Sequence, residues 1–294
     1  MFNSEKDGTQ PSNANIARVL ADATGAIIKD LSGGKIRHKS KLIDNIVAFI
    51  GTAGGTGTST MVANVAYMAK KKGLTVLVID LNIPYPIQHS YFGIRQAVNK
   101  NDLVSFLLGK NSIGESIESV GDISVLVSNN RNIMDSINCD NEVCSKNLED
   151  ALDKIRPLFD IILIDCPMDI EKDIVNTALY RANMIYTVWD ESIACISNME
   201  RLRRNMSLSG IEAYNKVRVV FNKRTSIHYS RYPFDRLKLE VVASFPFELA
   251  VIEASLNGKI FCDKGESLSK NSAFFVDETG RLTDKILETG GYMK

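Results

Sequence analysis

Short runs in which every position is apolar recur along the chain from about residue 45 onward. They read NIVAFI, LTVLVID, ISVLVS, FDIILID, NMIYTVW, KVRVVFN and VVASFP. These runs are rich in Val and Ile, and the segments between them are long enough to form helices. Runs without polar alternation are typical of strands buried on both faces of a mostly parallel sheet. The sequence therefore predicts an α/β fold with a doubly wound, mostly parallel sheet whose ligand site lies at the carboxyl ends of the strands.

The first 44 residues differ from this pattern. Residues 1–14 are polar, and the next 17 residues place apolar side chains at helical spacing, which predicts one amphipathic helix. The apolar positions are Ile16, Val19, Leu20, Ala23, Ile27 and Leu31. The basic linker SGGKIRHKSK follows, interpreted as a solvated hinge, with docking to an acidic partner or a lipid surface as the alternative. We therefore expect an N-terminal extension, residues 1–44, ahead of one domain at residues 45–294.

Composition and charge narrow the class of protein. The 294 residues are 45% hydrophobic and 24% charged, with a formal net charge of zero. These values fit a soluble globular protein without a global basic field that would attract nucleic acid or acidic lipid. No apolar run reaches the roughly 18 residues of a membrane span, and the N-terminus has no hydrophobic signal core, so we expect a cytoplasmic protein with no integral membrane segment. The five cysteines are odd in number and lack CxxC spacing, which argues against a disulfide framework or a zinc site.

A glycine-rich stretch, IGTAGGTGTST, follows the first predicted strand and precedes a helical pattern. Gly54, Gly55 and Gly57 permit turns that bring N–H groups around a phosphate, and the positive end of the following helix points the same way. A standard phosphate-binding loop reads GxxxxGK[ST], and Thr58 stands here where the lysine is expected. Ser59 keeps the hydroxyl that ligates magnesium. For the glycines alone, the alternative is a turn that serves only packing.

Two of the predicted strands end in an aspartate, Asp80 in LTVLVID and Asp165 in FDIILID. If their strands flank the first one, both carboxylates project toward the glycine loop. An aspartate at a strand end near a loop hydroxyl is the arrangement that holds magnesium through water. A single strand-end aspartate is usually a turn cap. The pair, together with the loop, predicts a nucleotide site in which Ser59 and Asp165 bind magnesium.

In this order the motifs resemble the deviant Walker ATPases, which include ParA, MinD and their relatives. The family reads K-G-G-x-G-K-[ST]-T, N-x-A, G-x-x-V-L-L-I-D-x-D and D-x-x-x-x-D-x-P. The chain reads AGGTGTST, ANVA, GLTVLVIDLN and FDIILIDCP, and the resemblance covers about residues 45–290. It implies a P-loop NTPase fold, ATP or ADP with Mg²⁺ as ligands, and a homodimer with nucleotide between the subunits.

The resemblance also implies roles for individual residues. Asp80 and Asn82 stand at the catalytic D-x-D positions, and Asp165 stands at the position of the Walker B carboxylate. Asn222 matches the asparagine that reads adenine, with a simple strand-end turn as the alternative. Pro246 lies in FPFELAVIEASLNGK, which resembles the segment that closes the base pocket. The residues implied to line the nucleotide are Gly54, Gly55, Thr56, Gly57, Thr58, Ser59, Thr60, Asn222 and Pro246.

Three departures from the family pattern each remove a charge. Ala53 replaces the signature lysine, Thr58 replaces the loop lysine, and Asn82 replaces the second aspartate of D-x-D. An ammonium about 4 Å from a phosphate oxygen contributes on the order of 4 kcal/mol at an effective dielectric of about 20, and a hydroxyl recovers only part of this. We therefore expect weak or absent binding of ATP and no efficient hydrolysis. Candidates for a compensating cation are Lys223, Arg224 and Arg131, with ordinary surface positions as the alternative.

The combined interpretation is a degenerate ParA/MinD-like protein that acts as a localisation or assembly scaffold, with weak or absent ATP hydrolysis. The TadZ and CpaE proteins, which resemble ParA and localise Flp pilus machinery at cell poles, tolerate such losses. They usually carry a longer receiver-like domain before the ATPase core, whereas about 44 residues precede the first predicted strand here. We expect a protein partner in a larger assembly, with recruitment to a membrane-associated complex or a cell pole.

Two alternative functions remain open. An active ParA-type ATPase for partitioning requires non-specific DNA binding, for which RLRRN at residues 201–205 is a candidate patch, with a solvated helix face as the alternative. The segment IPYPIQHSYFGI resembles part of the bacterial tyrosine kinases, which suggests a kinase-like ATPase domain. Those kinases end in a tyrosine-rich tail, whereas this chain ends TGGYMK.

Overall fold

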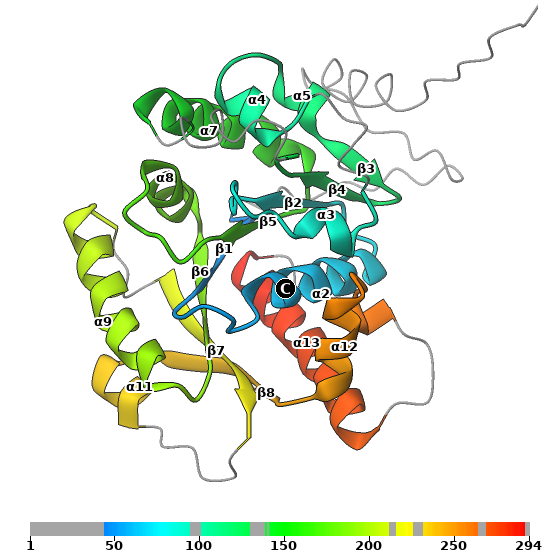
Figure 1. Ribbon diagram of the computed structural model, residues 1–294, viewed down its shortest axis with the longest axis vertical. Helices are drawn as coiled ribbons and strands as arrows, with labels where there is room; N and C mark the ends of the chain where they lie inside the picture. Colours follow the sequence, from blue (N-terminus) through cyan, green and yellow to red (C-terminus); the bar gives the residue numbers. More distant parts are fainter. Residues whose placement is uncertain are drawn as a thin grey trace, which may run out of the picture.

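The computed structural model describes residues 44–94, 101–129, 139, 141–211, 216–225, 232–263 and 269–291. In this part of the chain, one eight-stranded, mostly parallel sheet lies between two layers of helices (Figure 1). The predicted fold class is confirmed. The amphipathic helix and basic linker predicted before residue 44 lie outside the described residues, as does Arg131. No helix in the described ranges combines the length and the hydrophobicity that crossing a membrane requires.

The strands follow the apolar runs of the sequence. They are β1 (Ile46–Gly51), β2 (Val76–Asp80), β3 (Glu118–Val120), β4 (Ile123–Leu126), β5 (Ile161–Cys166), β6 (Met184–Trp189), β7 (Val217–Arg224) and β8 (Glu240–Pro246). Every residue of β1, β2, β5 and β6 is buried, as expected for strands covered on both faces. The short strand β3 was not predicted, because its three residues are partly exposed and form no apolar run.

The helices divide into two layers. One layer contains α2 (Thr58–Lys71), α3 (Gln88–Tyr91), α12 (Leu249–Leu256), η3 (Phe261–Asp263) and α13 (Lys270–Thr289). The other contains α4 (Leu103–Leu107), α5 (Ile113–Ser116), α7 (Glu142–Ile155), η2 (Arg156–Leu158), α8 (Asp173–Arg181), α9 (Ile193–Leu208) and α11 (Tyr232–Leu237). Successive side chains of a strand point to opposite faces. In β1, Ile46, Ala48 and Ile50 therefore enter the core under α7 and α8, whereas Val47 and Phe49 enter the core under α2 and α13.

The strand order is β3-β4-β2-β5-β1-β6-β7-β8, and the direction in which strands are added reverses at β1. All neighbouring pairs are parallel except β3 and β4. The chain first builds the sheet on one side of β1 and later, from β6 onward, on the other side. In a doubly wound sheet, the crevice at this reversal lies at the carboxyl ends of the strands. The glycine loop joins β1 to α2 at this point.

The strand order decides a condition that the sequence left open. Both aspartates were predicted to project toward the loop if their strands flank β1, and β5 does so, whereas β2 lies beyond β5. Asp165 therefore stands next to the loop strand, and Asp80 stands one strand further away. Apolar runs identify strands but carry no information about which strand pairs with which, since sheet order depends on contacts distant in sequence.

A buried asparagine fixes α2 against the C-terminal part of the fold. The Asn64 amide nitrogen donates to the carbonyl of Thr60 at 2.7 Å, and its oxygen accepts from the N–H of Cys262 at 2.8 Å. Asn64 is fully buried, and Cys262 lies 198 residues further along the chain in η3. The bond therefore ties the helix that follows the glycine loop to the segment that precedes α13.

Replacing Asn64 by alanine should lower the free energy of unfolding by about 1–3 kcal/mol, because the buried N–H of Cys262 then loses its acceptor. Urea unfolding followed by circular dichroism measures this change. Asn205→Ala on α9 is the matched control and should change the free energy by less than about 0.5 kcal/mol. Equal stability of Asn64→Ala and the wild type would contradict the role given to this side chain.

Candidate functional site

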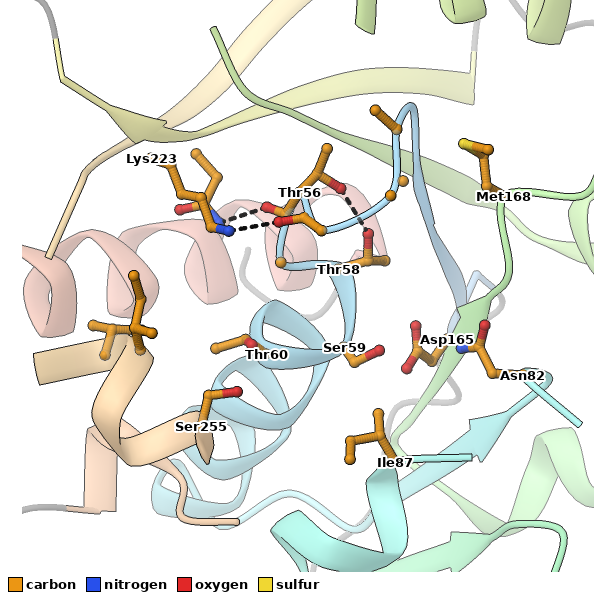
Figure 2. A pocket seen from close by; sticks show the side chains of 18 of the residues that line it. Thr56, Thr58, Ser59, Thr60, Asn82, Ile87, Asp165, Met168, Lys223 and Ser255 are labelled. Atoms are coloured by element: carbon orange, nitrogen blue, oxygen red, sulfur yellow. Dashed lines mark hydrogen bonds between the residues drawn. The ribbon is translucent and has the colours of Figure 1, made fainter. Parts of the chain in front are cut away.

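A cavity of about 430 Å³ opens at the carboxyl ends of the central strands. The glycine loop, the start of α2, the ends of β5 and β7, and α12 form its walls (Figure 2). Its volume falls within the range of roughly 300–1,000 Å³ that is usual for small-molecule sites. The predicted residues that line it are Gly54, Gly55, Thr56, Gly57, Thr58, Ser59, Thr60, Asn82, Asp165, Asn222 and Pro246. Of the predicted site residues, only Asp80 does not line the cavity.

Two hydroxyl side chains of the loop, those of Thr56 and Thr58, fold back toward Gly51. A Cβ added to Gly51 would lie 2.7 Å from Oγ1 of Thr58 and 2.8 Å from Oγ1 of Thr56. These two hydroxyls form a hydrogen bond of 3.3 Å with each other. By contrast, a Cβ added to Gly54 or Gly55 would meet no atom within 4 Å. Thr58 thus occupies the lysine position without filling the space beside Gly54 and Gly55.

The first turn of α2 is open to an anion. Its N-cap residue, Gly57, has a φ of 93° and forms no side-chain cap. The first N–H groups of an α-helix have no partner within the helix and carry the positive end of its dipole. An anion in the cavity would therefore meet these donors directly.

Asn222, at the end of β7, braces the loop from the side. Its amide nitrogen donates to the carbonyl of Thr56 at 2.8 Å. The amide passes so close to Gly57 that a Cβ there would lie 2.5 Å from this nitrogen. Gly57 is therefore required both by its positive φ and by this close approach. Asn222 contacts the loop itself, which goes beyond the simple strand turn considered as the alternative.

The two strand-end aspartates lie side by side. Asp165 pairs in register with Asp80, and both residues are fully buried. Burial, followed by repulsion from Asp80, raises the pKa of Asp165 to about 8, although hydrogen bonds from Gln88 and Ser59 oppose the shift. Removing two adjacent carboxylates from water disfavours their charged forms. This pair therefore holds a proton more tightly than exposed aspartates do.

Asp80 organises the segment that follows β2. Its carboxylate accepts hydrogen bonds from the backbone N–H groups of Asn82 at 3.0 Å, Ile87 at 2.8 Å and Gln88 at 3.0 Å. Burial raises the pKa of Asp80, and these three donors oppose that effect. Asp80 thus shapes the backbone that carries Asn82 and Ile87 to the rim of the cavity. We assign it a supporting position behind the site.

Gln88 connects this segment to Asp165 and the loop. Its amide nitrogen donates to Oδ2 of Asp165 at 2.8 Å and to the carbonyl of Ser59 at 3.0 Å. Gln88 was not predicted from the sequence, because a polar residue after two prolines in a short helix looks like a surface position. The only available signal was its place within IPYPIQHSYFGI.

The site meets the requirements of a magnesium ion. Oδ1 of Asp165 is buried without a hydrogen-bond partner among the described residues. Figure 2 shows the Ser59 hydroxyl pointing toward the neighbouring Asp165 carboxylate. A hydroxyl beside a carboxylate fits the oxygen ligands that Mg²⁺ prefers, and Ser59 and Asp165 would be the side chains that hold the ion. The described residues contain no group of three or more His, Cys, Asp or Glu suited to a metal, so phosphate oxygens and water would complete the coordination.

Tyr91 and α12 form the wall on the other side of the cavity. The Tyr91 hydroxyl bonds to Oγ1 of Thr60 at 2.8 Å and to Oγ of Ser255 at 2.5 Å. This chain of hydrogen bonds joins the start of α2 to α12. Val251 and Ile252 add apolar surface on this side, which suits the face of a base. Tyr91 was not predicted from the sequence, since its role depends on contacts with α12, 164 residues away.

The positive charge at the cavity comes from one of the three candidate cations. Among the described residues that line it, Lys223 is the only Lys, Arg or His, whereas Ala53 and Thr58 at the family's lysine positions are neutral. The Lys223 ammonium donates to the carbonyl of Gly55 at 2.5 Å (Figure 2). Arg224, the neighbouring candidate, does not line the cavity.

The raised pKa of Asp165 predicts a pH-dependent stability. Its pKa is about 8 in the folded chain and about 3.9 when unfolded, so the folded state holds the proton more tightly. The associated stability is complete below about pH 4 and is lost as pH rises through about 8. Urea titrations from about pH 5 to about pH 8.5 should therefore show the free energy of unfolding falling more steeply in the wild type than in Asp165→Asn. Asp169→Asn, nearby and exposed, should keep the wild-type slope, and equal slopes in all three proteins would contradict this assignment.

Solved structures share this fold. MinD of Pyrococcus horikoshii, complexed with Mg-ADP, superposes with a TM-score of 0.70 at 18% identity, over 85% of this chain and 98% of that chain. The cell division ATPase MinD of Pyrococcus furiosus superposes with a TM-score of 0.67 at 19% identity, over 82% of this chain and 98% of that chain. A ParA family ATPase of Chlorobium tepidum superposes with a TM-score of 0.63 at 15% identity, over 86% of this chain and 100% of that chain. At such identities, the likeness establishes the MinD/ParA-type P-loop fold alone.

Sequence comparison identifies a relative and a family. An uncharacterized ATP-binding protein of Methanocaldococcus jannaschii is 31% identical over 155 residues, which are 52% of this chain and 55% of that protein. The match thus spans about half the length of the curated relative. Residues 44–216, which include the glycine loop and both strand-end aspartates, match the AAA_31 family model, described as an AAA domain. With more than half of its length matched, the chain belongs to the AAA_31 family.

Proposed function

We propose that the protein binds ATP or ADP with Mg²⁺ in this cavity, hydrolyses ATP slowly or not at all, and serves as a placement module in a larger assembly. One observation carries this proposal: the phosphate loop is open and well formed although its lysines are absent. A chain that had lost nucleotide binding would not need open space beside Gly54 and Gly55 of the loop. A chain that relied on rapid turnover would need the missing charges.

Binding is supported by groups other than the lysines. The loop N–H groups and the uncapped start of α2 each contribute about 1 kcal/mol toward an anion. The open space at Gly54 and Gly55 allows phosphates to approach the backbone closely. MinD of Pyrococcus horikoshii, which shares the fold, was solved with Mg-ADP. Together these features support a weakened nucleotide site.

Slow turnover follows from the charge distribution. Phosphoryl transfer is accelerated mainly by preorganised charge at the transferring group. Thr58 offers a hydroxyl that is already bonded to Thr56, and Ala53 offers no polar group. Asn82 lies at the rim but carries no negative charge with which to polarise an attacking water. Interactions that stabilise the transition state more than bound ATP are therefore few.

Ser59 and Asp165 would hold the magnesium ion, which when bound neutralises charge on the terminal phosphates. Gln88 fixes one oxygen of the Asp165 carboxylate and leaves the other toward the cavity. Burial raises the pKa of both Asp165 and Asp80. The free site thus avoids two adjacent buried negative charges.

A homodimer with facing cavities is part of the proposal. Met168 and Ile87 line the cavity and are 50% and 39% exposed, so a second copy would cover apolar surface at its mouth. Because residue 53 is alanine and not the signature lysine, the contact between the two subunits would be weaker. A protein partner in a pilus or secretion assembly, at a membrane-associated complex or a cell pole, completes the proposed role.

The DNA-partitioning alternative has less support. In the proposed DNA patch on α9, Arg201 forms an ion pair with Glu171, and Leu202 and Met206 are buried. The patch is therefore partly neutralised and partly a packing face. For the kinase-like alternative, the single tail tyrosine, Tyr292, lies outside the described residues.

The charge argument predicts a gain of affinity on restoring the lysines. Wild-type protein with Mg²⁺ should release phosphate from ATP at the background rate. Thr58→Lys combined with Ala53→Lys should lower the calorimetric Kd for ATP by about two powers of ten. Thr58→Met with Ala53→Met, of similar length but uncharged, is the matched control and should not tighten binding. Robust wild-type turnover would contradict the proposal.

The proposed dimer contact is tested by sedimentation velocity with Mg-ATP. Met168→Glu should raise the dimer dissociation constant by at least about tenfold, because it places charge in the apolar contact. Leu208→Glu changes an exposed apolar residue outside the cavity and should leave dimerisation unchanged. A wild type that stays monomeric at saturating nucleotide, or a Met168→Glu that dimerises normally, would contradict this arrangement.

A further inference from the structure

Strand β7 deviates from regular geometry where it reaches the glycine loop. Its register with β8 shifts between Phe221 and Arg224, which marks a bulge or irregularity. Within this stretch, Lys223 has a φ of 55°, a left-handed conformation that is uncommon for a residue other than glycine. Bulges and strained backbone often redirect a side chain at a functional site. Here the result is that consecutive side chains, Asn222 and Lys223, both reach the loop.

The two side chains bond to consecutive peptide groups. Asn222 donates to the carbonyl of Thr56, and the Lys223 ammonium donates to the carbonyl of Gly55. A hydrogen bond from a charged donor is stronger than a neutral one, so the lysine contributes the stronger restraint. Lys223 is also the only Lys, Arg or His among the described residues of the cavity wall.

The strand order fixes where this charge lies relative to the magnesium end. The order β5-β1-β6-β7 separates β7 from β5 by three strand spacings, so the backbone of Lys223 lies roughly 14 Å from that of Asp165. Lys223 lines the cavity at the end of β7, next to Arg224, which pairs with Pro246 of β8, on the side where the base and ribose would lie.

We infer that Lys223 is a nucleotide-binding cation that restrains the loop through Gly55 and contacts the base and ribose side of the nucleotide, outside the region of phosphoryl transfer. This inference rests on the proposed function, since it assumes that the cavity binds nucleotide. The charge retained by this chain then supports affinity for the whole nucleotide and adds nothing specific to the terminal phosphate. Lys223 is a binding and positioning residue, with no catalytic role.

The test compares ATP, ADP and AMP. Lys223→Asn removes the charge and shortens the side chain that extends to the Gly55 carbonyl, but asparagine tolerates a positive φ. It should raise the Kd by about tenfold, by a similar factor for Mg-ATP, Mg-ADP and AMP, measured by calorimetry with AMP in competition. Lys223→Arg should restore binding to within about threefold, because it keeps the charge. Arg224→Gln, an adjacent cation outside the cavity, is the matched control and should bind as the wild type does.

Hydrogen exchange of the loop amides in the nucleotide-free protein provides a second readout. Lys223→Asn should speed exchange at residues 54–58, and Lys223→Arg should not. Unchanged affinity in Lys223→Asn, when the wild type binds nucleotide, would overturn this inference alone. A loss confined to ATP would also overturn it, because the lysine would then act at the terminal phosphate. A wild type that binds none of the three nucleotides would overturn the proposed function and this inference together.

Discussion

The open shape of the glycine loop depends on hydrogen bonds that hold its carbonyl groups toward β7. Asn222 and Lys223 bind the carbonyls of Thr56 and Gly55. Because a trans peptide is planar, its C=O and N–H groups point in opposite directions. Fixing these two carbonyls toward β7 therefore turns the next two N–H groups, those of Thr56 and Gly57, away from it. A loop without lysines can in this way keep its donors oriented, since its geometry comes from a neighbouring strand.

The charge of the site is arranged differently from that of a phosphate loop with two lysines. The two aspartates, Asp165 and Asp80, lie side by side at the ends of β5 and β2, whereas Lys223 lies in β7, on the other side of β1. The aspartate pair is tolerable without metal because burial raises its proton affinity. Gln88 adds a neutral donor there instead of a charged one. Under the proposed function, the site accepts a hydrated cation with phosphate but contributes little charge of its own to the reacting group.

The sequence predicted the parts of this structure that depend on local pattern. Unbroken apolar runs predicted most strands, and the glycine loop with Ser59, Asp165 and Asn222 predicted the position of the cavity. Features set by distant contacts were not predictable in the same way. The place of β5 between β1 and β2, which moves Asp80 behind the site, is one example. Gln88, and the choice of Lys223 over Arg224, are others, because each depends on a backbone path that apolar periodicity does not determine.

The strand order also explains how a nucleotide fold can lose turnover and keep binding. Under the proposed function, the residues at the ends of β1 and β5 act on the terminal phosphate and magnesium, whereas those at β7, β8 and α12 lie beside the base. Each group of residues then contacts a different part of the nucleotide. The loop between them is held from both sides, by Asn222 and by the Asn64 bond that fixes α2. Under the proposed function, the neutral residues at positions 53, 58 and 82 lower catalysis, while the fold around the cavity is kept.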